Sequence, residues 1–262
     1  MRKVVAILGP PERWVPLCRP YRQLADFVCV SPIRAQPIDD ANFSLFLVDL
    51  FAGRFEVLVV TCPTVIESMV HMARGRKMLD RLREAVSRTE MVVIGERTSA
   101  AATHHGLRVA SVAPEATTDS LVGHINRLPR RGTMALLRSD QGSPQMVTDL
   151  ETMGWKVEQV SVYSLLVDEG EEMEGLLDLL EDGGIDVLAF PTPAHAQAFL
   201  VQMEGRDGKE NALMLLEGVA VAAMGRETRE RLEEYGVHVS LVPERADAES
   251  MLRLLVSKVE EI

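Results

Sequence analysis

The stretch GVAVAAMGRETRERLEEYGVHVSL (218–241) joins a short apolar run, a glycine, a polar segment, a second glycine and another apolar run. An earlier stretch, MVVIGERTSAAATHHGLRVASV (91–112), has the same order. Both predict a strand, a helix closed by glycine, and a further strand. At a constant separation of 130 positions, the following residues pair: Gly95 with Gly225, Thr98 with Thr228, Gly106 with Gly236, and Val109 with Val239.

The same separation holds upstream of these stretches. FEVLVVTCPTVIESMV (55–70) lies over IDVLAFPTPAHAQAFL (185–200), and more weakly KVVAIL (3–8) lies over TMALLR (133–138). Because the same offset of 130 positions aligns all of these stretches, the sequence contains one unit, about half as long as the chain, that occurs twice. The sequence therefore predicts a duplicated α/β module with a cleft between two similar halves.

Composition narrows the classes of function. With 262 residues the chain is long enough for two α/β domains, and its net charge of −11 argues against general binding to nucleic acid or anionic membranes. Two local basic pieces, RGRK (74–77) with Arg81 and Arg83, and RLPRRG (127–132), are interpreted as a solvated helix face and a loop.

The cysteines and the apolar runs bear on the compartment. Cys18, Cys29 and Cys62 lack metal-ligand spacing and leave one cysteine unpaired, which suits a reducing compartment. The apolar run near the N-terminus stops at Gly9-Pro10, and no run reaches the ~20 residues of a membrane span. We expect a soluble, cytoplasmic protein without contact to membranes.

Apolar runs that read as buried strands alternate with helical segments along the chain. The helix expected at 12–24 contains two prolines, and the long one at 64–88 is expected to break near Gly75. Segments 31–42 and 164–172 are linker candidates. About ten strands in this alternation predict two five-stranded, doubly wound parallel sheets rather than one closed barrel.

Ligands of open parallel sheets bind beyond the carboxyl ends of the strands, where the following helices present free N–H groups. In this chain those ends carry small hydroxyl residues beside glycine or proline. Each could be an ordinary helix cap, but their recurrence in both repeats favours a binding role for the set. The candidate residues are Thr61, Cys62, Pro63, Gly95, Thr98, Arg138, Ser139, Thr192, Pro193, Gly225 and Thr228.

The usual catalytic motifs are absent from the sequence: no glycine-rich phosphate loop, no zinc-binding His-Glu-x-x-His and no Gly-x-Ser-x-Gly. His104-His105 is interpreted as a helix C-terminal cap, His71 and His195 as core or surface residues, and the segment 205–209 as a surface turn. Tyr163 ends a predicted strand just before the second linker. Tyr163 could pack against the residues of a hinge between the domains, or it could donate a proton to a leaving hydroxyl. The sequence favours neither interpretation over the other.

Taken in order, the motifs resemble those of the uroporphyrinogen-III synthase family over almost the full length. The matching pieces are VLVVTCPTVIESMV, VVIGERTSAAATHHGLRV, LLRSDQGSPQMVTDLETMGWKVEQVSVY, VLAFPTPAHAQAF and VAAMGRETRERLEEYGVHVSLVPE. Each motif is weak alone, and their ordered set is fairly specific.

The resemblance implies two flavodoxin-like domains joined by a two-stranded connector. One domain would comprise residues 1–34 and 168–262, the other residues 37–163, with linkers at 35–36 and 164–167. The implied reaction cyclises hydroxymethylbilane, a linear tetrapyrrole, to uroporphyrinogen III with loss of water and inversion of the D ring. It uses no metal or organic cofactor, and a monomer suffices for it.

Residue roles follow from the same resemblance. Tyr163 matches a family tyrosine that protonates the departing hydroxyl. Thr98, Thr192 and Thr228, with the backbone around Thr61–Pro63 and Gly225, match positions that line the cleft. One departure is Leu8-Gly9-Pro10, where the family has Thr-Arg-Pro and an anion-binding arginine.

This departure leaves two alternatives open. One is a non-catalytic two-domain sensor that closes on a tetrapyrrole or another polycarboxylate. The other, more distant, is a hinged binding protein for a small anion.

Overall fold

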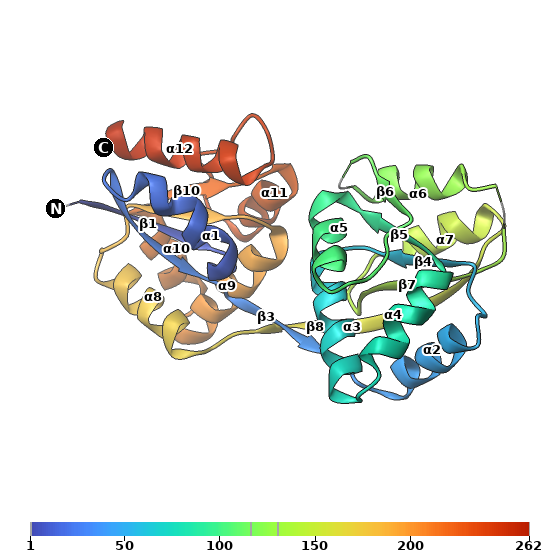
Figure 1. The fold of residues 1–262 in the computed structure, drawn as a ribbon. Helices are drawn as coiled ribbons and strands as arrows, with labels where there is room; N and C mark the ends of the chain where they lie inside the picture. Colours follow the sequence, from blue (N-terminus) through green and yellow to red (C-terminus); the bar gives the residue numbers. More distant parts are fainter. Residues whose placement is uncertain (1, 116, 130, 262) are drawn as a thin grey trace. The chain divides into compact units, whose positions relative to one another are not determined.

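The computed structural model describes residues 2–115, 117–129 and 131–261. The chain folds into two compact units. Unit 1 comprises the residues up to Arg34 and those from Val167 onward, and unit 2 comprises Ala35–Leu166. In Figure 1 each unit is a sheet with helices on both of its faces, so the α/β fold class predicted from the strand–helix alternation is confirmed. The expected five strands per sheet are wrong, because among the described residues one sheet has four strands and the other has six.

The sheet of unit 1 has the strand order β10-β9-β1-β2, all parallel. Leu241 extends it by an isolated parallel bridge to Ala222. The strands are β1 (Lys3–Leu8), β2 (Ala25–Val30), β9 (Val187–Phe190) and β10 (Ala220–Ala223).

Alternate side chains of β1 enter two different cores, because successive residues of a strand point to opposite faces. Ala6 and Leu8 pack in the cluster that also holds residues of α8 (Glu171–Glu181), α9 (Pro193–Asp207), α10 (Lys209–Glu217) and α11 (Arg226–Tyr235). Val5 and Ile7 pack in the cluster that holds residues of α1 (Pro11–Cys18) and α12 (Ala248–Glu261). A short 3-10 turn, Arg19–Tyr21, follows α1.

The sheet of unit 2 has the order β3-β8-β7-β4-β5-β6. Its strands are β3 (Ile33–Pro37), β4 (Val57–Val60), β5 (Glu90–Ile94), β6 (Ser111–Ala113), β7 (Thr133–Ser139) and β8 (Lys156–Val167). From β8 to β6 the pairs are parallel. Shifted by 130 positions, β8-β7-β4-β5-β6 corresponds to β2-β1-β9-β10 and the Leu241 bridge, so the sequence repeat is also a repeat of topology.

Two clusters again cover the two faces of this sheet. Leu58 and Val60 pack in the cluster that holds residues of α2 (Ala41–Phe51), α3 (Pro63–Gly75), α4 (Leu79–Arg88) and α5 (Gly95–His104). Val57 and Val59 pack in the cluster that holds residues of α6 (Thr118–Asn126) and α7 (Pro144–Thr152).

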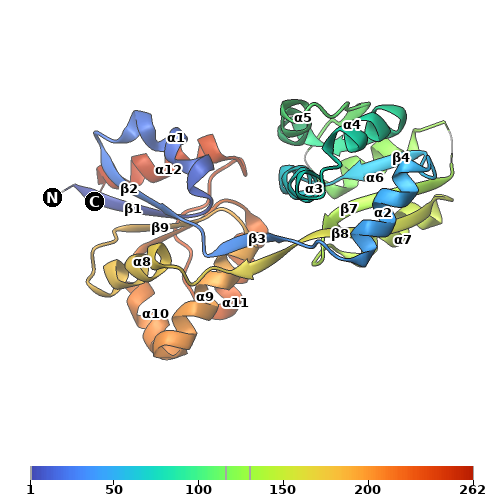
Figure 2. The ribbon, with the colours of Figure 1, turned by 60° about the horizontal axis from the view of Figure 1, so that its bottom comes forward.

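The two segments that pass between the units pair with each other. Asp168 donates its backbone N–H to the carbonyl of Pro32 over 2.9 Å, and Ile38 donates to Val162 over 3.0 Å. Residue numbers rise on one segment as they fall on the other, so β3 and β8 run antiparallel, as Figure 2 shows. The linker candidates at 31–42 and 164–172 are therefore partly strand.

Several other elements differ from the expectation. The helix expected at 64–88 breaks after Gly75 as predicted, giving α3 and α4. The helix expected at 12–24 is shorter, because α1 ends at Cys18. Helix α10 was missed, although Gly208 of the predicted turn does separate it from α9 with a φ of +81°. Of the basic piece 127–132, Arg130 lies outside the described residues.

Candidate functional site

Each sheet has one point where the strand order reverses, between β1 and β9 in unit 1 and between β7 and β4 in unit 2. In open α/β sheets with this order, the crevice outside the carboxyl ends of those two strands is the usual place for a ligand. Thr61–Pro63 follows β4, Arg138 and Ser139 end β7, and Thr192-Pro193 follows β9. The structure thus places seven of the predicted residues at these reversal points.

Tyr163 lies in β8 opposite Ser139, next to a register shift between Arg138 and Ser139. Its hydroxyl is 3.4 Å from the Sγ atom of Cys62 and also hydrogen-bonds to Ser139. Three neighbouring strands therefore bring Tyr163, Ser139 and Cys62 together. Burial raises the pKa of Tyr163 above its ordinary value, and the neighbouring Cys62 raises it further, so the phenol is neutral at physiological pH.

Thr61 and Cys62 have different roles at the end of β4. The Thr61 hydroxyl donates to the carbonyl of Leu137 over 3.3 Å, which ties β4 to β7. Cys62 precedes α3, and its side chain makes no capping hydrogen bond. Pro63 occupies the first turn of α3, where its missing N–H costs nothing. The start of α3 therefore lacks a side-chain cap from Cys62.

Arg138 is 5 % exposed, and its guanidinium lies under the loop that leads to α7. It donates to the carbonyl of Ser143 over 2.6 Å and to Oε1 of Gln159. Its Nε atom has no partner among the described residues. A Cβ at Gly142 would lie 2.5 Å from that Nε, so only glycine allows the loop to close over Arg138. Burial lowers the pKa of Arg138.

The two glycine–threonine pairs that repeat in the sequence lie at the starts of two helices: Gly95 and Thr98 at α5, and Gly225 and Thr228 at α11. Gly95 opens α5 with a φ of +69°, a conformation that favours glycine. Gly225 precedes α11 in an extended conformation, with Ala246 in van der Waals contact with a Cβ placed there. Thr98 and Thr228 are 2 % and 3 % exposed, so both threonines point into the packed interior of their own units.

Thr192 and His195 form a cap at the start of α9. The Thr192 Oγ1 atom is 2.6 Å from Nδ1 of His195, and the backbone N–H of His195 donates to Oγ1 over 3.4 Å. Burial lowers the pKa of His195 to about 4, helped by the charge of Arg13. The ring is therefore neutral at physiological pH, and Oγ1 of Thr192 and Nδ1 of His195 share one hydrogen bond. The threonine hydroxyl is therefore oriented by the histidine.

Sequence reasoning assigned no functional role to His195 and did not consider Asp140. The pattern Thr192-x-x-His195 has the spacing of a helix-capping pair, which could have identified the histidine. Asp140 directly follows the β7 end, accepts a hydrogen bond from Ser164 over 2.7 Å, and donates its N–H to the Tyr163 carbonyl over 3.1 Å. Its charge also raises the pKa of Tyr163.

Gly9, where the family pattern has arginine, packs against Trp14. A Cβ at Gly9 would lie 2.5 Å from Nε1 of the fully buried Trp14 ring. The indole of Trp14 therefore fills the space that a side chain at position 9 would enter.

Two surface hollows lie near strand ends. One, of about 340 Å³, is lined in unit 1 by Pro11, Val30, Ser31, Asp168, Gly170, Glu171, Glu172 and Met173. The other, of about 310 Å³, is lined in unit 2 by Ala35, Pro37, Thr64, Glu67, Ser68, Val70, His71, Arg74 and His105. His105 caps α5, as expected, and its Nε2 atom is 2.8 Å from Glu67. The second hollow adjoins the first turn of α3.

Within the described residues no group of three or more histidine, cysteine, aspartate or glutamate side chains is arranged to hold a metal ion. All three cysteines are free thiols. Among the helices the structure describes, none combines the length and apolar character needed to cross a bilayer.

Comparison with known proteins gives concordant matches. The family model described as uroporphyrinogen-III synthase HemD matches residues 25–253. A protein of Methanothermobacter thermautotrophicus, provisionally named a uroporphyrinogen-III synthase, is 30% identical over 215 residues, 80% of this chain and 81% of that protein. The uroporphyrinogen-III synthase of Chlorobaculum parvum is 24% identical over 261 residues, 98% of this chain and 100% of that protein.

A crystal structure supports the fold. A mutant uroporphyrinogen III synthase of Thermus thermophilus superposes with a TM-score of 0.65 at 20% identity, covering 99% of this chain and 100% of that one. The family match spans far more than half of the sequence, and it confirms the resemblance seen in the motifs. The chain belongs to the uroporphyrinogen-III synthase family.

Proposed function

We propose that this chain is a uroporphyrinogen-III synthase, a lyase that cyclises hydroxymethylbilane to uroporphyrinogen III with loss of water and inversion of the D ring. Family membership supports the general activity. The observation that carries the reaction is the position of Tyr163: a neutral phenol at the carboxyl ends of the strands, within 3.4 Å of Cys62.

The reaction needs little chemistry from the protein. A pyrrole nitrogen of the substrate supplies the electron pair that expels the hydroxyl from the hydroxymethyl carbon. Tyr163 donates a proton to that hydroxyl, which leaves as water, and the phenolate then regains a proton. The chain must mainly hold the substrate in the folded geometry that yields a spiro intermediate, because unassisted closure gives the simple ring.

Carboxylate recognition would rest on local groups, because the net charge of −11 repels anions at long range. The uncapped start of α3 after Cys62 and the starts of α5, α9 and α11 present backbone N–H groups and positive helix ends. We propose that the substrate is bound by the strand-end residues Thr61, Cys62, Pro63, Gly95, Ser139, Thr192, Pro193 and Gly225. The buried Thr98 and Thr228 would support the starts of α5 and α11 from inside their units. Arg138 and His195 act by positioning, since each is hydrogen-bonded to neighbouring protein groups.

The proposal also includes what the sequence predicts about oligomeric state, compartment, partners and cofactors. The protein acts as a monomer in the cytoplasm on a small linear tetrapyrrole, without nucleic acid, membrane, metal or organic cofactor.

The test is incubation of the purified chain with freshly generated hydroxymethylbilane, followed by oxidation and separation of the porphyrin isomers. We expect the type III isomer in excess. Formation of the type I isomer alone, at the spontaneous rate, would refute the proposal. If the substrate then still bound, the chain would be a non-catalytic tetrapyrrole sensor.

A further inference from the structure

The basic piece that begins at RGRK (74–77) contributes to a surface hollow that has no place in the proposed reaction. This hollow has a volume of about 490 Å³ and lies in unit 2 between α2 and the start of α4. Its lining residues are Ser44, Leu47, Val48, Phe51, Ala52, Arg76, Met78 and Arg81. We call it the α2–α4 hollow. It shares no residue with the strand-end set.

The floor of the α2–α4 hollow is apolar and open to solvent. The side chains of Val48 and Met78 are 59 % and 37 % exposed, although both are hydrophobic. Leu47 and Phe51 contribute further apolar surface below them. Clustered exposed apolar side chains beside charged groups are characteristic of binding surfaces.

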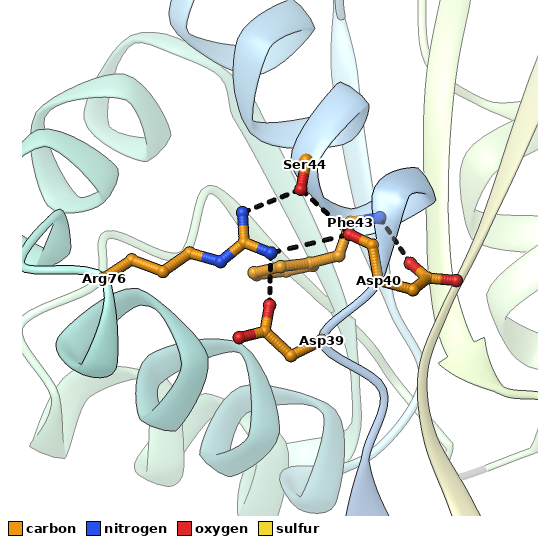
Figure 3. A network of polar contacts seen from close by, with 5 residues as sticks. All are labelled: Asp39, Asp40, Phe43, Ser44 and Arg76. Atoms are coloured by element: carbon orange, nitrogen blue, oxygen red, sulfur yellow. Dashed lines mark hydrogen bonds and ion pairs between the residues drawn. The ribbon is translucent and has the colours of Figure 1, made fainter.

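Arg76, one of the lining residues, is held in a network of polar contacts, as Figure 3 shows. Its guanidinium lies over the ring of Phe43 at 5.4 Å, donates to Oγ of Ser44 over 2.9 Å, and pairs with the carboxylate of Asp39. It also donates to the carbonyl of Asp40, the residue that caps α2. The charge of Arg76 is thereby balanced, and the α3–α4 turn is tied to the start of α2.

Arg81 has a different environment. Its guanidinium lies 4.2 Å from the ring centroid of Phe51, and within residues 2–115, 117–129 and 131–261 no hydrogen bond or ion pair engages it. The nearby carboxylates are already paired: Asp80 with Arg83 over 3.0 Å and Asp49 with Arg54 over 2.6 Å. Arg81 therefore offers a guanidinium fork, stacked on an aromatic ring, to an anionic group.

We propose that the α2–α4 hollow binds a small amphipathic organic anion. Its apolar body would lie on Val48, Phe51 and Met78, and its carboxylate or sulfonate would pair with Arg81. The volume of about 490 Å³ lies within the usual range for small-molecule sites. Because the chain as a whole is acidic, the anion would be held at this hollow by the local charge of Arg81 and the apolar surface beside it.

The probe for this site is 8-anilinonaphthalene-1-sulfonate, an aromatic sulfonate that fluoresces when it leaves water. Titrated into the full-length chain, it should saturate at one equivalent. Arg81→Gln and Val48→Asp should each weaken binding about tenfold or more, since one removes the charged partner and the other places a like charge on the floor. Arg108→Gln, which removes an exposed arginine of unit 2 that lies outside the hollow and donates to the carbonyl of Ser87, should leave the affinity unchanged.

An uncharged analogue, N-phenyl-1-naphthylamine, separates the two parts of the site. It should bind at least about tenfold more weakly than the sulfonate and should not respond to Arg81→Gln. Circular dichroism checks that the variants at these exposed positions are folded. Absence of saturable sulfonate binding, or equal affinities for the native chain, Arg81→Gln and Val48→Asp, would overturn the proposal. These readouts do not depend on synthase activity.

Discussion

Tyr163 keeps its proton because its hydroxyl is buried beside Cys62 and Ser139. A raised pKa means that the folded state holds this proton more tightly than the unfolded chain does. Its contribution to stability is therefore present at neutral pH and is lost only as pH rises through the folded pKa. Over the same neutral range the phenol remains available as a proton donor.

Tyr163→Phe removes this donor and keeps the ring. We expect kcat for type III product to fall about 100-fold or more, with KM changed only a few-fold, because the proton is needed in the transition state. Isomer-resolved kinetics measure both. Tyr235→Phe is the matched control, since it removes a surface hydroxyl that bonds Glu204 in unit 1. An increase confined to KM would contradict the acid role.

His195 predicts a pH effect on stability. Its pKa is lowered from 6.5 to about 4 in the folded chain, so the unfolded chain takes up a proton first as pH falls. The free energy of unfolding should decrease from pH 7 to 4.5, with His195 accounting for roughly 2 to 3 kcal/mol of the loss. His195→Asn retains an acceptor near Nδ1 but cannot titrate, so its loss should be smaller by that amount in urea unfolding.

If the free energy of unfolding of His195→Asn fell with pH as steeply as that of the native chain, His195 would be protonated at the same pH in the folded and unfolded states, and the prediction would be wrong.

At the scale of the element, the turn between α3 and α4 has an unusual backbone. Lys77 has a φ of +57°, the one positive value among non-glycine residues in the described parts of the chain. The N–H of Met78 donates to the carbonyl of Ala73 over 2.8 Å, a helix-ending arrangement that normally places glycine at the left-handed position. The strain lies next to Arg76 and Met78 of the α2–α4 hollow.

Lys77→Gly should relieve this strain and raise the free energy of unfolding by about 1 kcal/mol. Lys77→Ala removes the same side chain but keeps the strain, so it should have little effect. Chemical denaturation of both variants distinguishes the backbone from the side chain. Equal shifts in the two variants would show that the side chain, and not the left-handed backbone, sets the stability of the turn.

The local sequence predicted the type of most elements because buried parallel strands are short apolar runs between turn residues. It missed α10, since the preceding Gly208 was interpreted only as part of a turn. Local pattern gave no sign of β3, because its pairing with β8 joins segments far apart in the chain, and only the family resemblance implied the two-stranded connector. Long-range pairing leaves no local pattern.

For the site, the strand-end rule predicted that Thr61, Cys62 and Ser139 lie at the carboxyl ends of strands, and the structure places them at the ends of β4 and β7, close to Tyr163. Their binding and catalytic roles stay predictions. The burial of Arg138 beneath Gly142 was not foreseeable, because it depends on how a loop closes over a side chain.

At the scale of the whole molecule, residues 35–166 contain two hydrophobic clusters of their own and every strand from β4 to β7. We expect this segment, expressed alone, to fold as a domain. Urea unfolding followed by the fluorescence of Trp155 should give a single cooperative transition. The segment 35–155 lacks β8, which is one of the two strands that pair with β7, and it should not fold. A gradual, non-cooperative signal from residues 35–166 would contradict autonomous folding.

Because unit 1 is interrupted by unit 2, the ribosome delivers its pieces at separate times. β1 and β2 are neighbours in the chain and in the sheet, but the other neighbour of β1, β9, is translated more than 150 residues after β2 ends. At a synthesis rate of about 5–20 residues per second, this strand pair waits roughly ten to thirty seconds for its sheet. A two-stranded ribbon is marginal in water, so the first piece of unit 1 depends during synthesis on strands that are translated much later, and until then it is exposed to aggregation.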